Sequence, residues 1–125
     1  TSNIVALDVI RAIRRENSLP ALEKHFGALL DEAQVRPAFA QALRDALVRA
    51  VAFADRAAKE TTAEGDAMAR QAASALYHCC SAIAMAWEAG RTGSAERLRF
   101  AQGVLVHRVM PQDPLAERTA PSDWN

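Results

Sequence analysis

The sequence is poor in the residues that mark sheet-rich and disulfide-rich proteins. Among its 125 residues are five glycines, five prolines, two cysteines and only 6% aromatic residues. Alanine, by contrast, occupies 28 positions. Alanine favours helices most strongly, and the β-branched residues that favour strands are sparse. The composition therefore predicts an all-α protein.

The chain also lacks a net charge and a long apolar run. Fifteen basic and fifteen acidic side chains cancel, so a polyanion partner would need a local basic patch. The longest stretch without a charged residue, 71–87, contains glutamine, serine and histidine. It is too polar and slightly too short for a membrane span, and we expect no membrane association.

The two cysteines, Cys79 and Cys80, are adjacent. Neighbouring residues rarely satisfy disulfide geometry, so we expect reduced thiols and a cytoplasmic protein. Consecutive helical positions diverge by about 100°, so His78, Cys79 and Cys80 cannot converge on one ion. We expect no metal site and interpret these residues as part of the core.

Hydrophobic periodicity and breaker residues predict about five helices joined by short loops. Short loops favour an antiparallel up-and-down helical bundle. The expected segments cover residues 3–15, 21–33, 37–60, about 25 residues ending near Gly90 or Gly93, and a last helix that reaches Met110. Ser18 and Ser94 are the expected caps, and Pro20 is expected in a first helical turn.

The opening residues Thr1, Ser2, Asn3 and Ile4, followed at once by a helix, resemble the E-G-T-x-x-I stretch near the C-terminal end of acyl-CoA dehydrogenases. The segments ALYHCCSAIAMAWEAGRTG and LRFAQGVLVHRVMPQDPLA are similar to the C-terminal region of the alkylation-response (AidB-like) flavoproteins of that superfamily. The resemblance implies the C-terminal part of an acyl-CoA dehydrogenase-like architecture.

This resemblance also implies a division of the chain. Residues 1–16 would end the dehydrogenase's C-terminal helical domain, and residues 17–115 would form a helical extension. The composition of the chain end separately predicts a mobile tail over residues 116–125, apart from Trp124, which we expect to dock. The catalytic glutamate of the family would precede Thr1, so no catalytic residue is expected here. The chain alone would then be inactive, although its parent would be an FAD-dependent enzyme acting on acyl-CoA.

In the family, the residues after the glutamate and glycine line the adenosine and pyrophosphate part of FAD. The resemblance therefore implies that Thr1, Ser2 and Asn3 contact FAD, most of which the N-terminal portion of the parent would bind. Backbone N–H groups at a helix start suit a diphosphate. The alternative is that Ser2 or Asn3 simply caps the first helix.

Arginines are the remaining candidates, as a nucleic-acid-binding surface. They lie in two groups, and the members of interest are Arg14, Arg15, Arg91, Arg97, Arg99 and Arg108. Arginines that share one face would contact phosphates in a salt-dependent manner. The alternative is a solvated face neutralised by nearby acids. Glu88, near Arg91, is interpreted as an ion-pair partner at the helix end.

Two functions follow as hypotheses. In the first, the chain is the helical C-terminal part of an FAD-dependent acyl-CoA dehydrogenase-like oxidoreductase, contributing to the FAD site and to assembly of a homo-oligomer, a dimer or a tetramer. In the second, it is a DNA-binding or protein-interaction module of an alkylation-response flavoprotein with little or no dehydrogenase activity. The arginine distribution distinguishes them.

Overall fold

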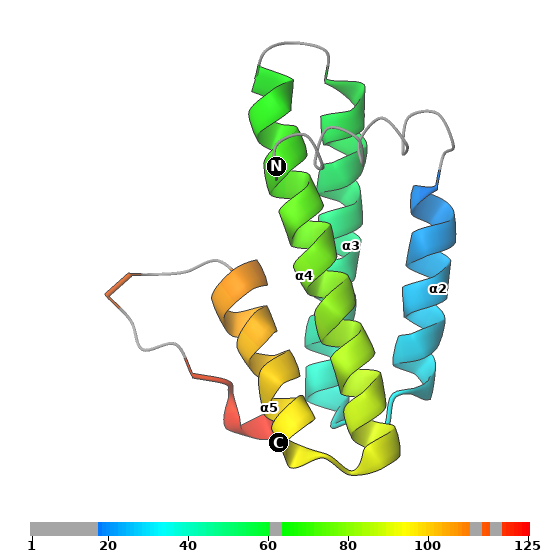
Figure 1. Cartoon of the computed structure of the whole chain (residues 1–125), viewed down its shortest axis with the longest axis vertical. Coiled ribbons are helices and arrows are strands. Elements are labelled where there is room, and N and C mark those ends of the chain that lie inside the picture. The colour runs from blue at the N-terminus through cyan, green and yellow to red at the C-terminus, as the bar shows by residue number, and fades with distance from the viewer. Residues whose placement is uncertain (1–17, 61–63, 111–113, 116–118) are drawn as a thin grey trace.

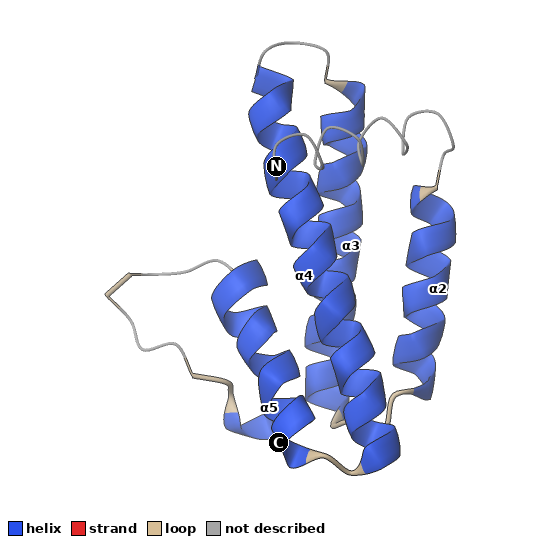
Figure 2. Cartoon of the chain, viewed as in Figure 1, coloured by secondary structure: helices blue, strands red, loops and turns tan. Residues whose placement is uncertain are grey.

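The computed structural model describes residues 18–60, 64–110, 114–115 and 119–125. Every regular element in these ranges is helical, and none is a strand (Figure 2). The α-helices are α2 (Leu19–Glu32), α3 (Pro37–Lys59), α4 (Glu64–Thr92) and α5 (Ala95–Val104). A π-helical turn, η1 (Leu105–Val109), continues α5, and a 3-10 turn, η2 (Ser122–Trp124), lies near the chain end.

The predicted all-α class is thus confirmed for the described residues, and their four α-helices correspond to four of the about five that the sequence predicts. The helix expected over 3–15 lies outside them. No described helix is both long and apolar enough to cross a membrane.

The four helices alternate in direction (Figure 1). The antiparallel pair α3 and α4 forms the centre, and α2 packs against both of these helices. Helix α5 and η1 pack against α4, on the other side from α2. This is the up-and-down order that short connections favour.

The helix starts follow local rules, with one correction. Pro20 lies in the first turn of α2, as predicted, and Ser94 Oγ caps α5 by accepting a hydrogen bond from Arg97 N at 3.2 Å. Ser18 occupies the cap position of α2, but its side chain makes no capping hydrogen bond. Its backbone lies in the helical region, and its carbonyl instead accepts from Leu22 N at 3.0 Å, so α2 begins earlier than expected.

The two candidate glycines at the end of α4 have different roles. Gly93 has a φ of +73°, the left-handed conformation that ends a helix. Gly90 lies inside α4, where a Cβ atom would come within 2.9 Å of the backbone nitrogen of Gln34. The absent side chain therefore lets the loop after α2 pass directly over α4.

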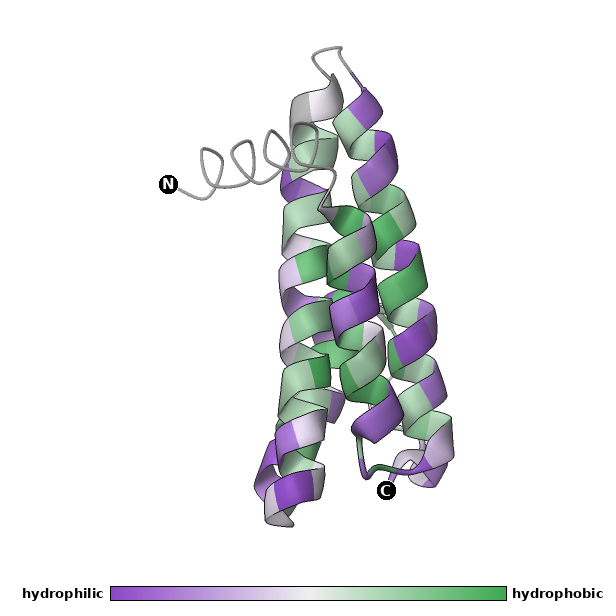
Figure 3. Ribbon diagram, turned by 90° about the vertical axis from the view of Figure 1, so that its right-hand side faces the viewer, coloured by the Kyte–Doolittle hydropathy of each residue, from purple (hydrophilic) through white to green (hydrophobic). Residues whose placement is uncertain are grey.

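The core lies between α3 and α4 and is rich in alanine. Small side chains let two helices approach closely, and larger ones fill the remaining space. On α3, apolar residues at three- and four-residue spacing are all buried, namely Phe39, Leu43, Leu47, Ala50 and Ala54. The apolar stripe of α4 is buried at Ala72, Cys79, Ile83 and Ala86, whereas Met68 and Ala75 are only partly buried. Apolar residues line the helix contacts in Figure 3.

Trp124 docks in this core, as expected. Its side chain is buried and lies against Phe39, with ring centroids 5.0 Å apart. Gln102, the one buried polar side chain among the described residues, donates from Nε2 to the Trp124 carbonyl at 3.2 Å and to Asn125 Oδ1 at 3.1 Å. Residues 116–118 of the expected tail lie outside the described ranges.

Candidate functional site

Part of the predicted site falls outside the described residues. Thr1, Ser2 and Asn3, the expected FAD contacts, and Arg14 and Arg15, the first arginine group, belong to the range 1–17. The FAD contacts and the contribution of the first helix to a basic surface therefore stay predictions. The four later arginines are all described.

Two of these four arginines interact with neighbours near the end of α4. Arg97 Nη1 forms an ion pair with Glu88 Oε2 at 2.6 Å, so the predicted pairing of Glu88 with Arg91 is wrong. Arg91 instead lies over the indole of Trp87, 4.6 Å from its ring centroid. A side chain from the first turn of α5 reaches Glu88 because the sharp turn at Gly93 folds α5 back beside α4. Arg97 is thus neutralised.

Trp87 extends this group of contacts to α2. Its indole Nε1 donates to Glu32 Oε2 at 3.3 Å, while its ring face carries the guanidinium of Arg91. The guanidinium of Arg91, the indole of Trp87 and the carboxylate of Glu32 thus contact one another in series, from α4 to the end of α2. These contacts tie helix ends together, which is a structural role.

Arg99 in α5 and Arg108 in η1 contribute to one surface. We call this surface the α5 outer face; it forms a shallow depression of about 690 Å³ lined by Glu96, Arg99, Phe100, Gly103, Val104, His107 and Arg108. Phe100 is 59% exposed there. Of the four candidate arginines that the structure describes, two therefore lie on one surface, and Glu96 lies near them in the first turn of α5.

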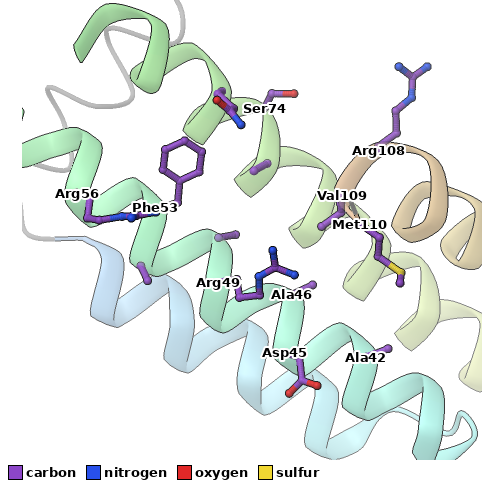
Figure 4. A pocket seen from close by; sticks show the side chains of 14 residues that line it. Ala42, Asp45, Ala46, Arg49, Phe53, Arg56, Ser74, Arg108, Val109 and Met110 are labelled. Carbon is purple, nitrogen blue, oxygen red and sulfur yellow. The ribbon is translucent and has the colours of Figure 1, made fainter. Parts of the chain in front are cut away.

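A second hollow, which we call the central groove, lies between α3, α4 and η1 and has a volume of about 660 Å³ (Figure 4). Its apolar surface comes from the small residues Ala46, Ala50 and Ala75 and from the larger Phe53 and Met110. The alanine side chains are too short to fill the groove, and Phe53 and Met110 form its borders. A volume of this size is typical of pockets that hold small molecules.

Three arginines line the central groove: Arg49, Arg56 and Arg108. In Figure 4, Arg49 lies between Phe53 and Met110, while Arg108 extends outward from the rim. Arg56 lies over the Phe53 ring, 5.4 Å from its centroid. Among the described residues, no carboxylate forms an ion pair with Arg49. A guanidinium beside an apolar surface suits a planar anion that carries an apolar group.

Asp45 is the only acidic residue that lines this groove in the part of the chain that the structure describes. Its carboxylate accepts a hydrogen bond from Gln41 Nε2 at 2.8 Å and points away from Arg49 in Figure 4. The groove is consequently positive.

This groove was not predicted from the sequence, although Arg49 and Arg56, two turns apart on α3, indicated a basic side of that helix. The η1 wall that closes the groove comes from a distant segment.

The thiols and His78 are held in their neutral forms. Burial raises the pKa of Cys79 to about 12, helped by the neighbouring Cys80, and burial raises the pKa of Cys80 to about 11. Burial, and secondarily the positive charge of Arg108, lowers the pKa of His78. The described residues contain no group of three His, Cys, Asp or Glu side chains that would hold a metal ion.

The chain matches no protein-family model, no curated protein and no solved structure.

Proposed function

We propose that this chain is the non-catalytic helical part of an FAD-dependent acyl-CoA dehydrogenase-like flavoprotein of the alkylation-response branch, and that its bundle serves assembly. The opening residues Thr1 to Asn3 support the link through their resemblance to the family's FAD-contacting stretch. In such a parent the flavin accepts a hydride from the acyl thioester, and the base lies before Thr1. A cytoplasmic location is part of the same proposal.

The observation that carries the assembly role is the α5 outer face. Most helices at the surface of a protein bury one face and expose polar side chains on the other. Helix α5 buries Ala101 and Gln102 on one side and still exposes the apolar Phe100 on the other, beside the partly buried Val104. An exposed apolar surface with charged residues at its edge is characteristic of a protein contact.

Intact mass and visible absorption of natively purified material containing this chain test the proposal. A larger companion segment or polypeptide with flavin bands near ~370 and ~450 nm, which acyl-CoA thioesters bleach, is the expected result. A colourless species with the 13.5 kDa mass of this chain alone, unable to bind a flavin-containing partner, would contradict it. The spectrum reports the cofactor independently of any surface on α5.

A second candidate function, DNA binding, is favoured by the central groove. Arg49, Arg56 and Arg108 line it with one acidic residue, so a phosphate backbone would find three guanidinium groups on one side of the bundle. The neutralised Arg97 does not contribute to this surface. Arg91 lies against Trp87, outside the groove.

The double variant Arg49→Glu/Arg56→Glu tests the DNA-binding function. We expect it to weaken binding to duplex DNA strongly and to reduce the salt dependence by about two phosphate contacts. The matched control is Lys24→Glu/Arg36→Glu, which changes net charge equally at exposed positions outside the groove. Equal duplex affinity of the two double variants would exclude the central groove as the DNA contact.

A further inference from the structure

We propose that the central groove binds a small aromatic monocarboxylate, with the carboxylate held by Arg49 and the ring lying on the alanine floor of the groove. This ligand goes beyond the two functions proposed above, and it requires only the helical chain itself. Three observations carry the proposal: an uninterrupted apolar floor, borders that favour aromatic rings, and an arginine without an acidic partner among the described residues.

The floor of the central groove consists of alanines. Ala42, Ala46 and Ala50 follow one another on α3 at intervals of four residues, and Ala75 lies beside them on α4. Ala46 and Ala50 are buried, so the floor lies below the longer side chains around it. Each alanine carries a single methyl group, and from Ala42 to Ala50 the floor extends about 12 Å at 1.5 Å per residue. A bicyclic ring can lie on an apolar surface of this length.

The borders of the groove suit a second aromatic ring. Phe53 and Met110 lie on either side of Arg49 in Figure 4. Aromatic rings pack favourably against one another, and a methionine sulfur gains from a ring nearby. A guanidinium also lies favourably over a ring, as Arg56 shows at Phe53, 5.4 Å from the ring centroid. An aliphatic ligand would gain only the burial of its apolar area, so these borders favour an aromatic one.

Arg49 is placed to bind the carboxylate. Asp45 lies one turn before it on α3, at the spacing at which an ion pair forms on a helix. The Asp45 carboxylate instead accepts from Gln41 Nε2 at 2.8 Å, and within the described ranges no ion pair forms at Arg49. A guanidinium presents parallel N–H donors that match the two oxygens of a carboxylate. The Arg49 side chain therefore offers these donors to a ligand on the floor.

The charges of the groove select an anion with a single charge. Arg49, Arg56 and Arg108 line the groove with one acid, Asp45, among the residues that the structure describes. Arg56 lies over Phe53, and Arg108 extends outward from the rim in Figure 4, so both contribute positive charge rather than a direct contact. One available guanidinium at the floor matches one carboxylate, which favours a monocarboxylate.

A heteronuclear NMR titration of the full chain with naphthoate tests the proposal. Saturable shifts are expected at the backbone amides of Ala46, Arg49 and Ala50, with a dissociation constant of about 1 mM or lower for a probe of this size. Naphthamide has the same shape without the charge, and we expect it to bind about tenfold more weakly or less. Decahydronaphthoate keeps the carboxylate on saturated rings, and we expect it to bind about threefold more weakly or less.

Two substitutions at exposed positions are expected to change the affinity in opposite directions. Arg49→Gln removes the guanidinium and should weaken naphthoate binding about tenfold or more. Asp45→Asn removes the acid that lines the groove and should strengthen binding about two- to threefold. Neither change should alter the affinity for naphthamide. The matched control Arg36→Gln removes an exposed arginine outside the groove and should leave naphthoate binding at the wild-type level.

Three results would overturn the proposal: no saturable shifts with naphthoate up to about 10 mM, shifts that lie outside the central groove, or binding that Arg49→Gln leaves unchanged. Equal affinity for naphthoate and decahydronaphthoate would overturn the aromatic ligand. These results are distinct from failure of the functions proposed above, because the titration contains neither flavin nor DNA. A chain that binds naphthoate but no flavin-containing partner loses only the flavoprotein link.

Discussion

The indole of Trp124 lies against the ring of Phe39, with a centroid separation of 5.0 Å and an angle of 32° between the ring planes. Phe39 is fully buried in the first turn of α3. The described end of the chain thus completes the core at the base of the bundle, and Gln102 holds it there by hydrogen bonds to Trp124 and Asn125.

We expect Trp124→Ala to lower the free energy of unfolding by about 3 kcal/mol, because it removes a large buried side chain and leaves a cavity beside Phe39. Denaturant unfolding monitored by circular dichroism measures this effect. The aromatic control is Tyr77→Ala: Tyr77 is 68% exposed, so its removal should change stability by less than about 0.5 kcal/mol. Equal effects of the two substitutions would show that Trp124 does not dock in solution.

Gly90→Ala is expected to destabilise the protein by about 1–3 kcal/mol, although alanine is the better helix former. The new methyl group would lie within 2.9 Å of Gln34 backbone nitrogen, which cannot move without displacing the loop after α2. The control is Gly27→Ala in α2, where nothing lies within 4 Å and a gain of up to about 1 kcal/mol is expected. A stabilising Gly90→Ala would refute the close approach.

We expect both cysteines to react with iodoacetamide at pH 8 at least about tenfold more slowly in the folded protein than in the denatured chain, because only the thiolate reacts. Their raised pKa values, about 12 for Cys79 and about 11 for Cys80, keep the thiols protonated in the folded protein. Mass spectrometry of each alkylated peptide over time measures the rates. Native rates equal to the denatured ones would contradict this prediction.

The same shifts predict how stability depends on pH in the alkaline range. A thiol whose folded pKa exceeds its unfolded pKa contributes stability that is present below about 9.0, the ordinary thiol value, and lost as the pH rises toward 12. Unfolding free energies of the wild type and of Cys79→Ala, compared between pH 8 and pH 11, isolate the contribution. We expect the alkaline loss to be smaller in the variant.

For His78 the expected sign is the opposite. Its pKa is lowered below 6.5, chiefly by burial and secondarily by Arg108, so its contribution to stability is present above that value and lost as the pH falls below it. Arg108→Gln should raise the pKa of His78 only part of the way toward 6.5, because the burial of the imidazole remains. NMR titration of the imidazole measures it, with Lys24→Gln as the control for a distant loss of charge. A His78 pKa above 6.5 in the wild type would exclude this account.

The parts of the fold that follow local rules could be predicted from the sequence. Helix α3 begins at Pro37 and ends within one residue of the predicted boundary, and Ser94 caps α5, because proline geometry and capping depend only on neighbouring residues. The buried face of α3 followed from its helical spacing in the same way. The described residues therefore confirm helices and their buried sides.

The candidate surfaces could be predicted far less well. The partner of Glu88 depends on how the turn at Gly93 places α5, so the sequence favoured Arg91 where the structure has Arg97. The central groove is bordered by η1, whose position against α3 and α4 results from tertiary packing. The outer apolar face of α5 was hidden because both sides of that helix carry apolar residues. Neither the partner of Glu88 nor the position of η1 is encoded in the spacing of residues along one helix.

The contact between Trp124 and Phe39 also orders the folding of the chain. The contacts of α2 with α3 and of α3 with α4 join helices that follow one another in sequence, and such local contacts close at low entropic cost. Trp124 must instead find Phe39, which lies far earlier in the sequence. We expect the three-helix part to form early and the docking of the indole against Phe39 to come last.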